Sequence, residues 1–401
     1  MEEWKEYKIG DIAKTNTSQY SLSENWKTIQ YLDTGSITKN QISGIEEFFG
    51  NTDLPSRARR KVKHGDIVYS CVRPNLCHYG YMDNPPANLL VSTGFAVITV
   101  DPNLADARYI YYFLTQNNIV QSLHTIGEQA VSTYPSIKAS DIENLTISLP
   151  NLPIQHKIAA ILSSLDDKIE VNRQINDNLE QQTHALFKTW FVDFYPFKAQ
   201  PFVESELGMI PQGWNILTFD QFICPSSEKV FVGELPEYSV TNSGIVPRDS
   251  KFKKQLSKDS SKNKVLRKDN LVFGMSREIL NWGIMEDEIG GVSSAYHVYT
   301  IDKNIISPTY LRLYMEAHIS DFNSLIGNAA REGQSLDKGA LMQTMVIVPP
   351  FKSWEKFLNY YNVLNEDTKR YVLESRRLAE LRDALLPRLM SGEIKVEDIT
   401  F

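Results

Sequence analysis

Cysteine, long apolar runs and excess charge are all scarce in this chain of 401 residues. Its three cysteines, Cys71, Cys77 and Cys224, form no CxxC pair, and their odd number argues against a disulfide framework. No apolar run approaches the roughly 20 residues that span a bilayer. The opening residues, MEEWKEYKIG, do not resemble a signal peptide. We therefore expect a cytoplasmic protein with reduced thiols.

Sequence motifs of catalysis are also missing. The chain has no GxSxG or HExxH motif, and its histidines are too scattered for a zinc site. The segment Asn84–Ala87 (NPPA) resembles a methyltransferase motif, but Ala87 replaces the aromatic residue that would stack on a base, and no glycine-rich cofactor loop precedes it. We therefore expect a non-catalytic binding protein that holds no cofactor or metal of its own.

The net charge of −7 argues against a protein that coats nucleic acid non-specifically. Two basic runs depart from this overall negative charge. Arg57–Lys63 holds five basic residues and no acid, and Arg248–Lys268 holds nine basic residues against two acids. Either run alone is typical of a solvated loop.

Two long stretches without an internal helix breaker predict long helices. Ile154–Trp190 would be about 55 Å long, and Trp354–Leu386 matches it near the other end of the chain. Apolar residues recur in both with heptad spacing, which predicts a coiled coil in which Asn172 fixes the register. The predicted seam positions are Ile158, Ile161, Leu165, Asn172, Ile175, Leu179 and Leu186 in the first helix and Phe357, Leu364, Tyr371, Leu378 and Leu385 in the second.

The two halves of the chain repeat the same order of features about 200 residues apart. Each half has an opening tryptophan, a polar region that ends in a basic run, and a strand that ends in Arg73 or Arg277. A short helix, a polar loop opened by Gly127 or Gly327, a β-rich segment ending in proline, and the long helix follow. Such a period indicates a duplicated domain. The equivalent positions of the basic runs favour two surfaces that serve one anionic partner.

Three motifs resemble the specificity (S) subunits of type I restriction-modification systems. They are the segment from Ile154 to Phe194 (IQHKIAAILSSLDDKIE through ALFKTWFVDF), Ile210–Trp214 (IPQGW) and Leu381–Ile394 (LRDALLPRLMSGEI). The similarity covers essentially the whole chain. It implies an α/β (α+β) fold with two tandem target recognition domains, each a mixed sheet with short helices, separated by an antiparallel coiled coil of two long helices. The expected parts are domain 1 (1–150), helix 1 (151–194), a linker (195–212), domain 2 (213–350), helix 2 (351–390) and a tail (391–401).

The resemblance also implies partners. The two domains would read a bipartite, asymmetric sequence in double-stranded DNA. Two methyltransferase (modification) subunits and two restriction (translocase–nuclease) subunits would dock on the chain, with no membrane partner. S-adenosylmethionine, ATP and Mg²⁺ would belong to those partners. The alternatives are a stand-alone sequence-specific DNA-binding or scaffold protein without a modification partner and, more remotely, a cryptic enzyme.

Candidate DNA contacts follow from the basic runs, the strand ends and the polar loops. Lysine and arginine supply phosphate contacts, whereas amide, hydroxyl and guanidinium groups can also read base edges. Ordinary surface salt bridges and loop capping are the alternative roles. The candidates are Arg57, Arg59, Arg60, Lys61, Lys63, Arg73, Gln129, Thr133 and Tyr134 in the first half and Lys251, Lys253, Lys254, Lys264, Arg267, Arg277, Arg331, Gln334 and Ser335 in the second.

Overall fold

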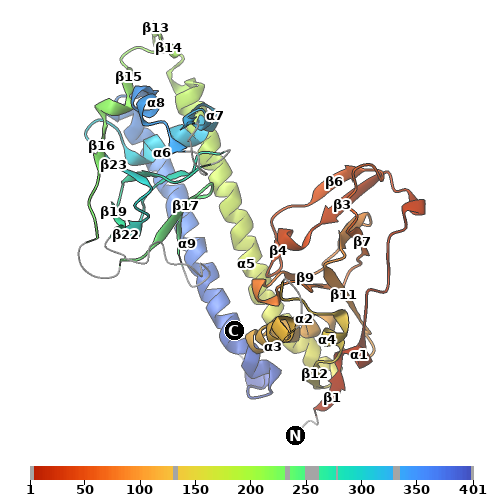
Figure 1. Cartoon of the computed structure of the whole chain (residues 1–401). Coiled ribbons are helices and arrows are strands. Elements are labelled where there is room, and N and C mark those ends of the chain that lie inside the picture. The colour runs from red at the N-terminus through yellow and green to blue at the C-terminus, as the bar shows by residue number, and fades with distance from the viewer. Residues whose placement is uncertain are drawn as a thin grey trace. The chain divides into compact units, whose positions relative to one another are not determined.

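The computed structural model describes residues 4–129, 134–230, 235–248, 262–276, 279–327 and 335–398 (Figure 1). The chain divides into two compact units. Unit 1 comprises Met1–Gln174 and Arg370–Phe401, and unit 2 comprises Ile175–Lys369. The helices α5 (Leu152–Phe187) and α9 (Phe351–Met390) each contribute residues to both units. The predicted domain boundaries at residues 150 and 213 stay predictions.

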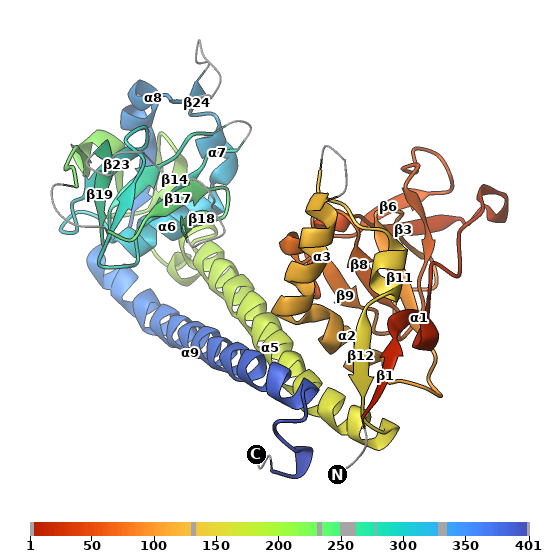
Figure 2. The ribbon, with the colours of Figure 1, turned by 60° about the horizontal axis from the view of Figure 1, so that its bottom comes forward.

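Unit 1 contains two four-stranded sheets. The first has the order β2 (Ala13–Thr15), β11 (Phe95–Val100), β8 (Ile67–Ser70), β9 (Tyr79–Tyr81), and all its neighbours are antiparallel. The second has the order β6 (Glu46–Phe49), β3 (Thr28–Leu32), β10 (Leu89–Ser92), β7 (Ala58–Lys61), with β3 and β10 parallel. The short pairs are β1 (Lys5–Lys8) with β12 (Thr146–Leu149), side by side in Figure 2, and β4 (Ile37–Thr38) with β5 (Gln41–Ile42).

The helices of unit 1 are α1 (Ile9–Ile12), α2 (Ala107–Thr115), α3 (Asn117–Gln129), α4 (Ala139–Glu143) and the shared long helices. Helix α3 corrects the sequence analysis, because Gly127 lies inside it and does not open a loop. A Cβ at Gly127 would lie 3.1 Å from the main-chain nitrogen of Ser136. The glycine therefore permits a close approach between α3 and the following segment, and the buried Leu123 on the same helix outweighs its low helix propensity.

Unit 2 repeats the strand order of the antiparallel four-stranded sheet of unit 1, which confirms the internal repeat. Its four-stranded antiparallel sheet runs β16 (Ile223–Ser226), β23 (His297–Ile301), β20 (Leu271–Phe273), β21 (Trp282–Ile284). The two-stranded pairs are β15 (Asn215–Thr218) with β26 (Met345–Val348), β19 (Lys264–Arg267) with β22 (Ile289–Val292), β17 (Tyr238–Thr241) with β18 (Gly244–Pro247), β13 (Phe202–Ser205) with β14 (Gly208–Pro211), and β24 (Ile326–Gly327) with β25 (Ser335–Leu336). The short helices are α6 (Pro308–Ala317), α7 (Ile319–Asn323) and α8 (Lys338–Gln343).

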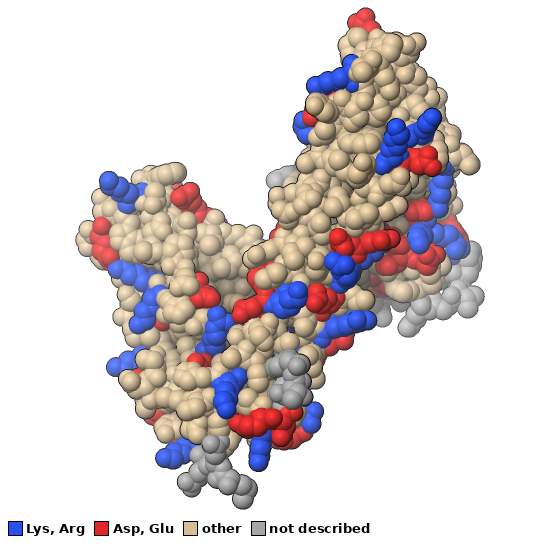
Figure 3. Space-filling view, turned by 180° about the vertical axis from the view of Figure 1, so that it is seen from behind, with Lys and Arg blue, Asp and Glu red and all other residues tan. Residues whose placement is uncertain are grey.

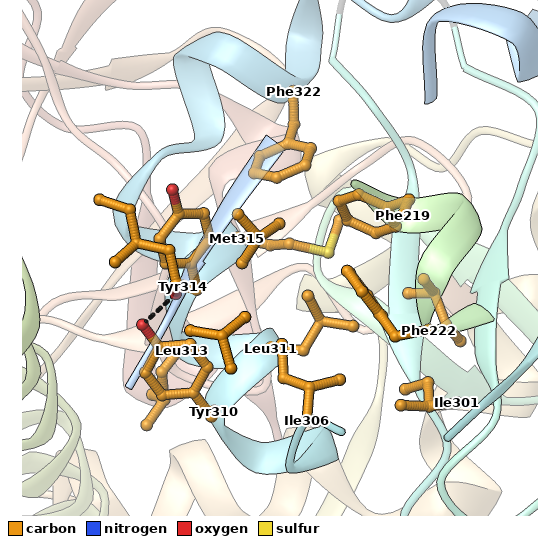
Figure 4. Packing of buried hydrophobic residues seen from close by; sticks show 14 of the residues in the cluster. Phe219, Phe222, Ile301, Ile306, Tyr310, Leu311, Leu313, Tyr314, Met315 and Phe322 are labelled. Carbon is orange, nitrogen blue, oxygen red and sulfur yellow. Dashed lines mark hydrogen bonds between the residues drawn. The ribbon is translucent and has the colours of Figure 1, made fainter. Parts of the chain in front are cut away.

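The core of unit 2 is rich in aromatic side chains. Figure 4 shows one part, in which Met315 of α6 lies beside Phe219, and Tyr310 of the same helix lies on the far side of Leu311. The Tyr310 hydroxyl is buried but donates a 2.7 Å hydrogen bond to the carbonyl oxygen of Ile347. That bond satisfies the one polar atom of the Tyr310 side chain, so the ring can lie among apolar neighbours without an unpaired polar group.

The long helices pack antiparallel within each unit. In unit 1 the fully buried Asn172 donates through Nδ2 to Glu374 Oε2 at 3.0 Å and to Ser375 Oγ at 3.3 Å. In unit 2 the rings of Phe187 and Phe357 lie 5.9 Å apart. All the predicted seam residues are buried or half-buried, with Ile158, Leu165, Asn172 and Phe357 the most buried. A mixed α/β fold with long helices is therefore confirmed.

The first long helix ends differently from the prediction. Its α-helical part stops at Phe187, three residues before the predicted Trp190, and a π-helical turn over Lys188–Val192 continues it. Both Phe187 and Phe191 are almost fully buried in the core of unit 2. No described helix is long and apolar enough to cross a membrane.

Candidate nucleic-acid interface

The first basic run forms β7, an edge strand of its sheet, and its cations lie in different surroundings. Arg57 and Lys63, at the two ends of the run, are exposed. Lys61 pairs with Glu24 at 2.5 Å and lies 5.2 Å from the Trp26 ring, and its hydrogen bond holds the pKa of the Glu24 carboxyl below the usual range. The outer side of β7 is partly covered, because Tyr20 N–H donates to the Arg59 carbonyl oxygen at 2.6 Å and Lys61 N–H to that of Ser18 at 3.2 Å.

Arg60 and Lys264 occupy equivalent places in the two units. Arg60 pairs with Val91 across β7 and β10, and Lys264 pairs with Val292 across β19 and β22. Arg60 Nη1 donates to the carbonyl oxygen of Phe95, and Lys264 Nζ donates to the carbonyl oxygen of Tyr296 at 2.5 Å.

These bonds turn the two cations inward. Burial lowers the pKa of both Arg60 and Lys264. Arg60 also donates to the side chain of Asn16. Arg60 therefore links the two four-stranded sheets of unit 1, and Lys264 links β19 to the residue just before β23. These roles compete with the predicted phosphate contacts.

Arg73 and Tyr134 come together at one exposed place in unit 1. The Arg73 guanidinium carbon lies 4.6 Å from the centre of the Tyr134 ring, and the Arg73 main-chain nitrogen donates to the carbonyl oxygen of Pro135 at 2.9 Å. Arg73 is exposed, and 55% of Tyr134 is exposed. A guanidinium on an aromatic ring can stack on bases or reach base edges. The predicted Gln129 is exposed at the end of α3.

Left-handed backbone conformations cluster beside Arg73. Arg73 has φ of 47°, Cys77 of 57° and Lys39 of 47°. Lys39 donates its main-chain N–H to the carbonyl oxygen of Cys77 at 2.8 Å, which joins the β4–β5 turn to the loop that holds Arg73. Non-glycine residues in this region are strained, and such strain gathers at functional sites. Lys39 and Asn40 form the two-residue turn of the β4–β5 hairpin, in which a positive φ at both positions is usual.

Unit 2 has fewer described candidates. Arg267 forms a bidentate pair with Glu228, at 2.6 Å and 3.0 Å, and this pair holds the pKa of Arg267 above its ordinary value. For Ser335 only the main chain, in β25, is described. The predicted residues that lie outside the described ones are Thr133, Lys251, Lys253, Lys254, Arg277, Arg331 and Gln334.

Positive and negative side chains interleave on the face drawn in Figure 3. The described part of that face shows no broad field of one sign, in keeping with the net charge of −7. Among the described residues, no group of three His, Cys, Asp or Glu side chains could hold a metal ion. An interface for DNA would therefore rest on local clusters of cations.

A cleft of about 730 Å³ in unit 1 was not foreseen from the sequence. Its lining includes Tyr112 and Arg108 from α2, Asp166 from α5 and Arg382 from α9. These residues are up to 274 positions apart in the sequence (382 − 108), so no local pattern could have brought them together.

Comparison with known proteins shows which family the chain resembles. Residues 1–181 match the family model described as type I restriction modification DNA specificity domain. The HindI specificity subunit of a type I restriction enzyme from Haemophilus influenzae is 27% identical, with 98% of this chain and 100% of that protein covered. Over nearly its whole length the chain is thus similar to specificity subunits of type I restriction enzymes.

Other specificity subunits are also similar to this chain along nearly its whole length. The MjaIX specificity subunit from Methanocaldococcus jannaschii is 25% identical, with 98% of this chain and 93% of that protein covered. The crystal structure of a type I restriction-modification S subunit from M. genitalium has the same fold, with a TM-score of 0.54 and 17% identity over 97% of this chain and 96% of that one. The described fold of this chain is thus found in a solved S subunit.

Proposed function

We propose that this chain is the DNA sequence-recognition part of a type I restriction-modification complex. The observation that carries the proposal is the repeat itself, in which two units share one strand order but differ in sequence. Two related readers that differ in their side chains suit a bipartite target whose two half-sites differ. The long helices, which contribute to both units, would set the distance between the half-sites.

In unit 1, different described residues would contact the phosphates and the bases of the DNA. The exposed Arg57 and Lys63 would bind phosphates, which supply affinity and register but no sequence information. Arg73, held against Tyr134 by its strained loop, would reach base edges in the major groove. Arg60 would hold the two sheets of unit 1 together, and Lys264 would hold β19 against the residue just before β23.

The chemistry would come from partner subunits. Two methyltransferase subunits, which carry S-adenosylmethionine, would dock on this chain and modify adenines at the target. Two ATP- and Mg²⁺-dependent restriction subunits would complete the cleaving complex. This chain would contribute the choice of sequence and no catalytic residue.

The experiment that tests the proposal is a map of methylated adenines in cells that carry the modification subunits with and without this chain. We expect a single two-part motif that appears only when the chain is present. Purification of the chain under the same conditions should capture the methyltransferase. A chain that binds DNA but captures no methyltransferase and changes no methylation would instead be a stand-alone DNA-binding protein.

A salt titration tests the phosphate contacts. The double variant Arg57→Ala/Lys63→Ala removes the two exposed cations of the β7 run, and the paired Arg60 is left intact. The slope of log K against log salt should become less steep by about 1.8, because each phosphate contact contributes about 0.9. Fluorescence anisotropy of a target duplex at several salt concentrations measures the slope.

The matched control is Lys352→Ala, which removes an exposed cation near the start of α9 in unit 2. It should leave the slope unchanged. An equal slope for the wild type and the double variant would remove Arg57 and Lys63 from the interface.

A further inference from the structure

One carboxylate in unit 1 joins three helices. Asp166 of α5 accepts a 2.7 Å hydrogen bond at Oδ2 from the hydroxyl of Tyr112, on α2. Its Oδ1 accepts a 2.6 Å hydrogen bond from Nη1 of Arg382, on α9. Tyr112 is almost fully buried, and the side chains of Asp166 and Arg382 are only 27% and 24% exposed. The short helix of the recognition unit is thereby bonded to both long helices through one group.

The surroundings make this polar junction more than a surface contact. Asp166, Tyr112 and Arg382 line the 730 Å³ cleft, so side chains do not fill this part of the contact between α2 and the long helices. Apolar packing continues elsewhere, where Ile158 and Leu386 join the same core as α2. Apolar contacts have no preferred direction, whereas hydrogen bonds to a charged group fix distance and angle. The junction is therefore the part of this contact that resists a change of angle.

Electrostatics keeps the two donors of the junction, Arg382 and Tyr112, in their bonding forms. Burial opposes the charge of Arg382, but Asp166 and Asp383 outweigh it and raise the pKa of the guanidinium. Burial and the neighbouring Asp166 also raise the pKa of the Tyr112 hydroxyl, which therefore remains a donor at neutral pH. An ionised carboxylate accepts bonds only, so two donors at its two oxygens define its position.

Unit 2 has a corresponding arrangement with different side chains. Arg312 of α6, the counterpart of α2 in the repeat, donates through Nη2 to the Tyr361 hydroxyl of α9 at 2.8 Å. Glu316, one turn further along α6, lies 3.5 Å from Arg312 and 3.2 Å from Nε2 of His184 on α5. In both units, polar groups tie the short helix to both long helices. The recurrence of the link with different chemistry indicates that the connection itself is what the fold requires.

We propose that the Tyr112–Asp166–Arg382 junction is a positioning device that sets how strictly the protein selects the spacer between its two half-sites. The inference rests on the proposed function. A reader that can tilt against the long helices can reach half-sites at several distances, whereas a fixed reader accepts one distance. Asp166 contacts no base and acts only through the orientation of α2. Its loss relaxes spacer selection and leaves the preferred bases of each half-site unchanged.

The test uses the full chain in its modification complex and a series of duplexes whose spacer is altered by one or two base pairs. Asp166→Asn removes the charge of the junction, and Tyr112→Phe removes one of its hydrogen bonds. Both variants nearly keep the volume of the side chain. In Asp166→Asn, the preference for the native spacer over its neighbours should fall about tenfold, the effect expected for the loss of a charge-assisted bond. Tyr112→Phe should lower it less. Binding to the native duplex should change only a few-fold.

Asp167→Asn is the matched control, because this neighbouring carboxylate is 70% exposed and lies 4.0 Å from its nearest cation, Arg108. It should leave spacer preference unchanged. If Asp166→Asn lowers thermal stability or overall affinity but keeps the wild-type spacer preference, the junction is structural only and the inference is overturned. A wild-type complex without any two-part sequence preference would instead overturn the proposed function.

Discussion

Replacement of Phe191 by alanine is expected to lower the free energy of unfolding of unit 2 by about 3–5 kcal/mol, the range for a large buried aromatic residue. Phe191 is 1% exposed, and besides its chain neighbours Phe187 and Trp190 it contacts four rings from other segments of the core. These rings, with centres 5.1–5.9 Å away, are Trp214, Tyr310, Trp354 and Phe357. Because they come from separate segments of unit 2, no single side-chain shift can fill the cavity. The shift of the denaturation midpoint followed by tryptophan fluorescence measures the loss.

Tyr360→Ala is the control for this prediction. Tyr360 also contacts the aromatic group through Trp190, at 6.1 Å, but 58% of it is exposed. Its removal should cost less than about 1 kcal/mol, as surface substitutions usually do. Equal losses for the two variants would mean that Phe191 does not hold the core together.

The long helices could be predicted from sequence because their pattern is local. Seam residues recur every three or four positions, and no residue between Ile154 and Trp190 breaks a helix. The repeat could be predicted for a similar reason, since both copies keep the order of their elements. Gly127 shows the limit of this reasoning. Its close approach to Ser136 is a tertiary contact, and sequence alone favoured the opening of a loop.

The candidate site was less predictable than the fold. A cluster of cations can be read from the sequence, but the direction in which each side chain points cannot. Arg57 and Arg60 belong to one run, yet Arg57 is exposed and Arg60 lies between the two sheets. Arg73 and Tyr134 were both candidates, and only the fold brings them into contact. Whether these residues touch DNA stays a prediction.

The buried Asn172 shows how sequence and fold combine. Its heptad position predicted a register-fixing role, and the structure supplies its partners, Glu374 and Ser375, more than 200 residues away. The Asn172 amide nitrogen reaches both acceptors in one alignment only, and a shift of the helices would leave it buried without partners. Asn172 and the Asp166–Arg382 pair thus both define how α5 and α9 align within unit 1.

Lengthening both long helices by three heptads is expected to lengthen the DNA spacer by nearly one helical turn. The insertions would follow Gln174 in α5 and precede Arg370 in α9, where the two units divide. These points face each other, because Asn172 bonds to Glu374 close by. Whole heptads keep the seam in phase. Twenty-one residues add about 31 Å of helix, close to the 34–36 Å of one DNA turn.

The recognised motif should therefore keep both half-sites and gain about nine base pairs of spacer, at 3.4 Å per base pair. Methylation mapping in cells reads the half-sites and the spacer together. Insertion of a single heptad in both helices is the contrast, because it adds about 10 Å, or roughly three base pairs. The second half-site would then turn to another face of the duplex, and methylation should be lost. An unchanged spacer with the three-heptad insertion would show that the helices do not measure the distance. Loss of methylation with one heptad, and methylation at a longer spacer with three heptads, would show that the helix pair sets the distance between the half-sites.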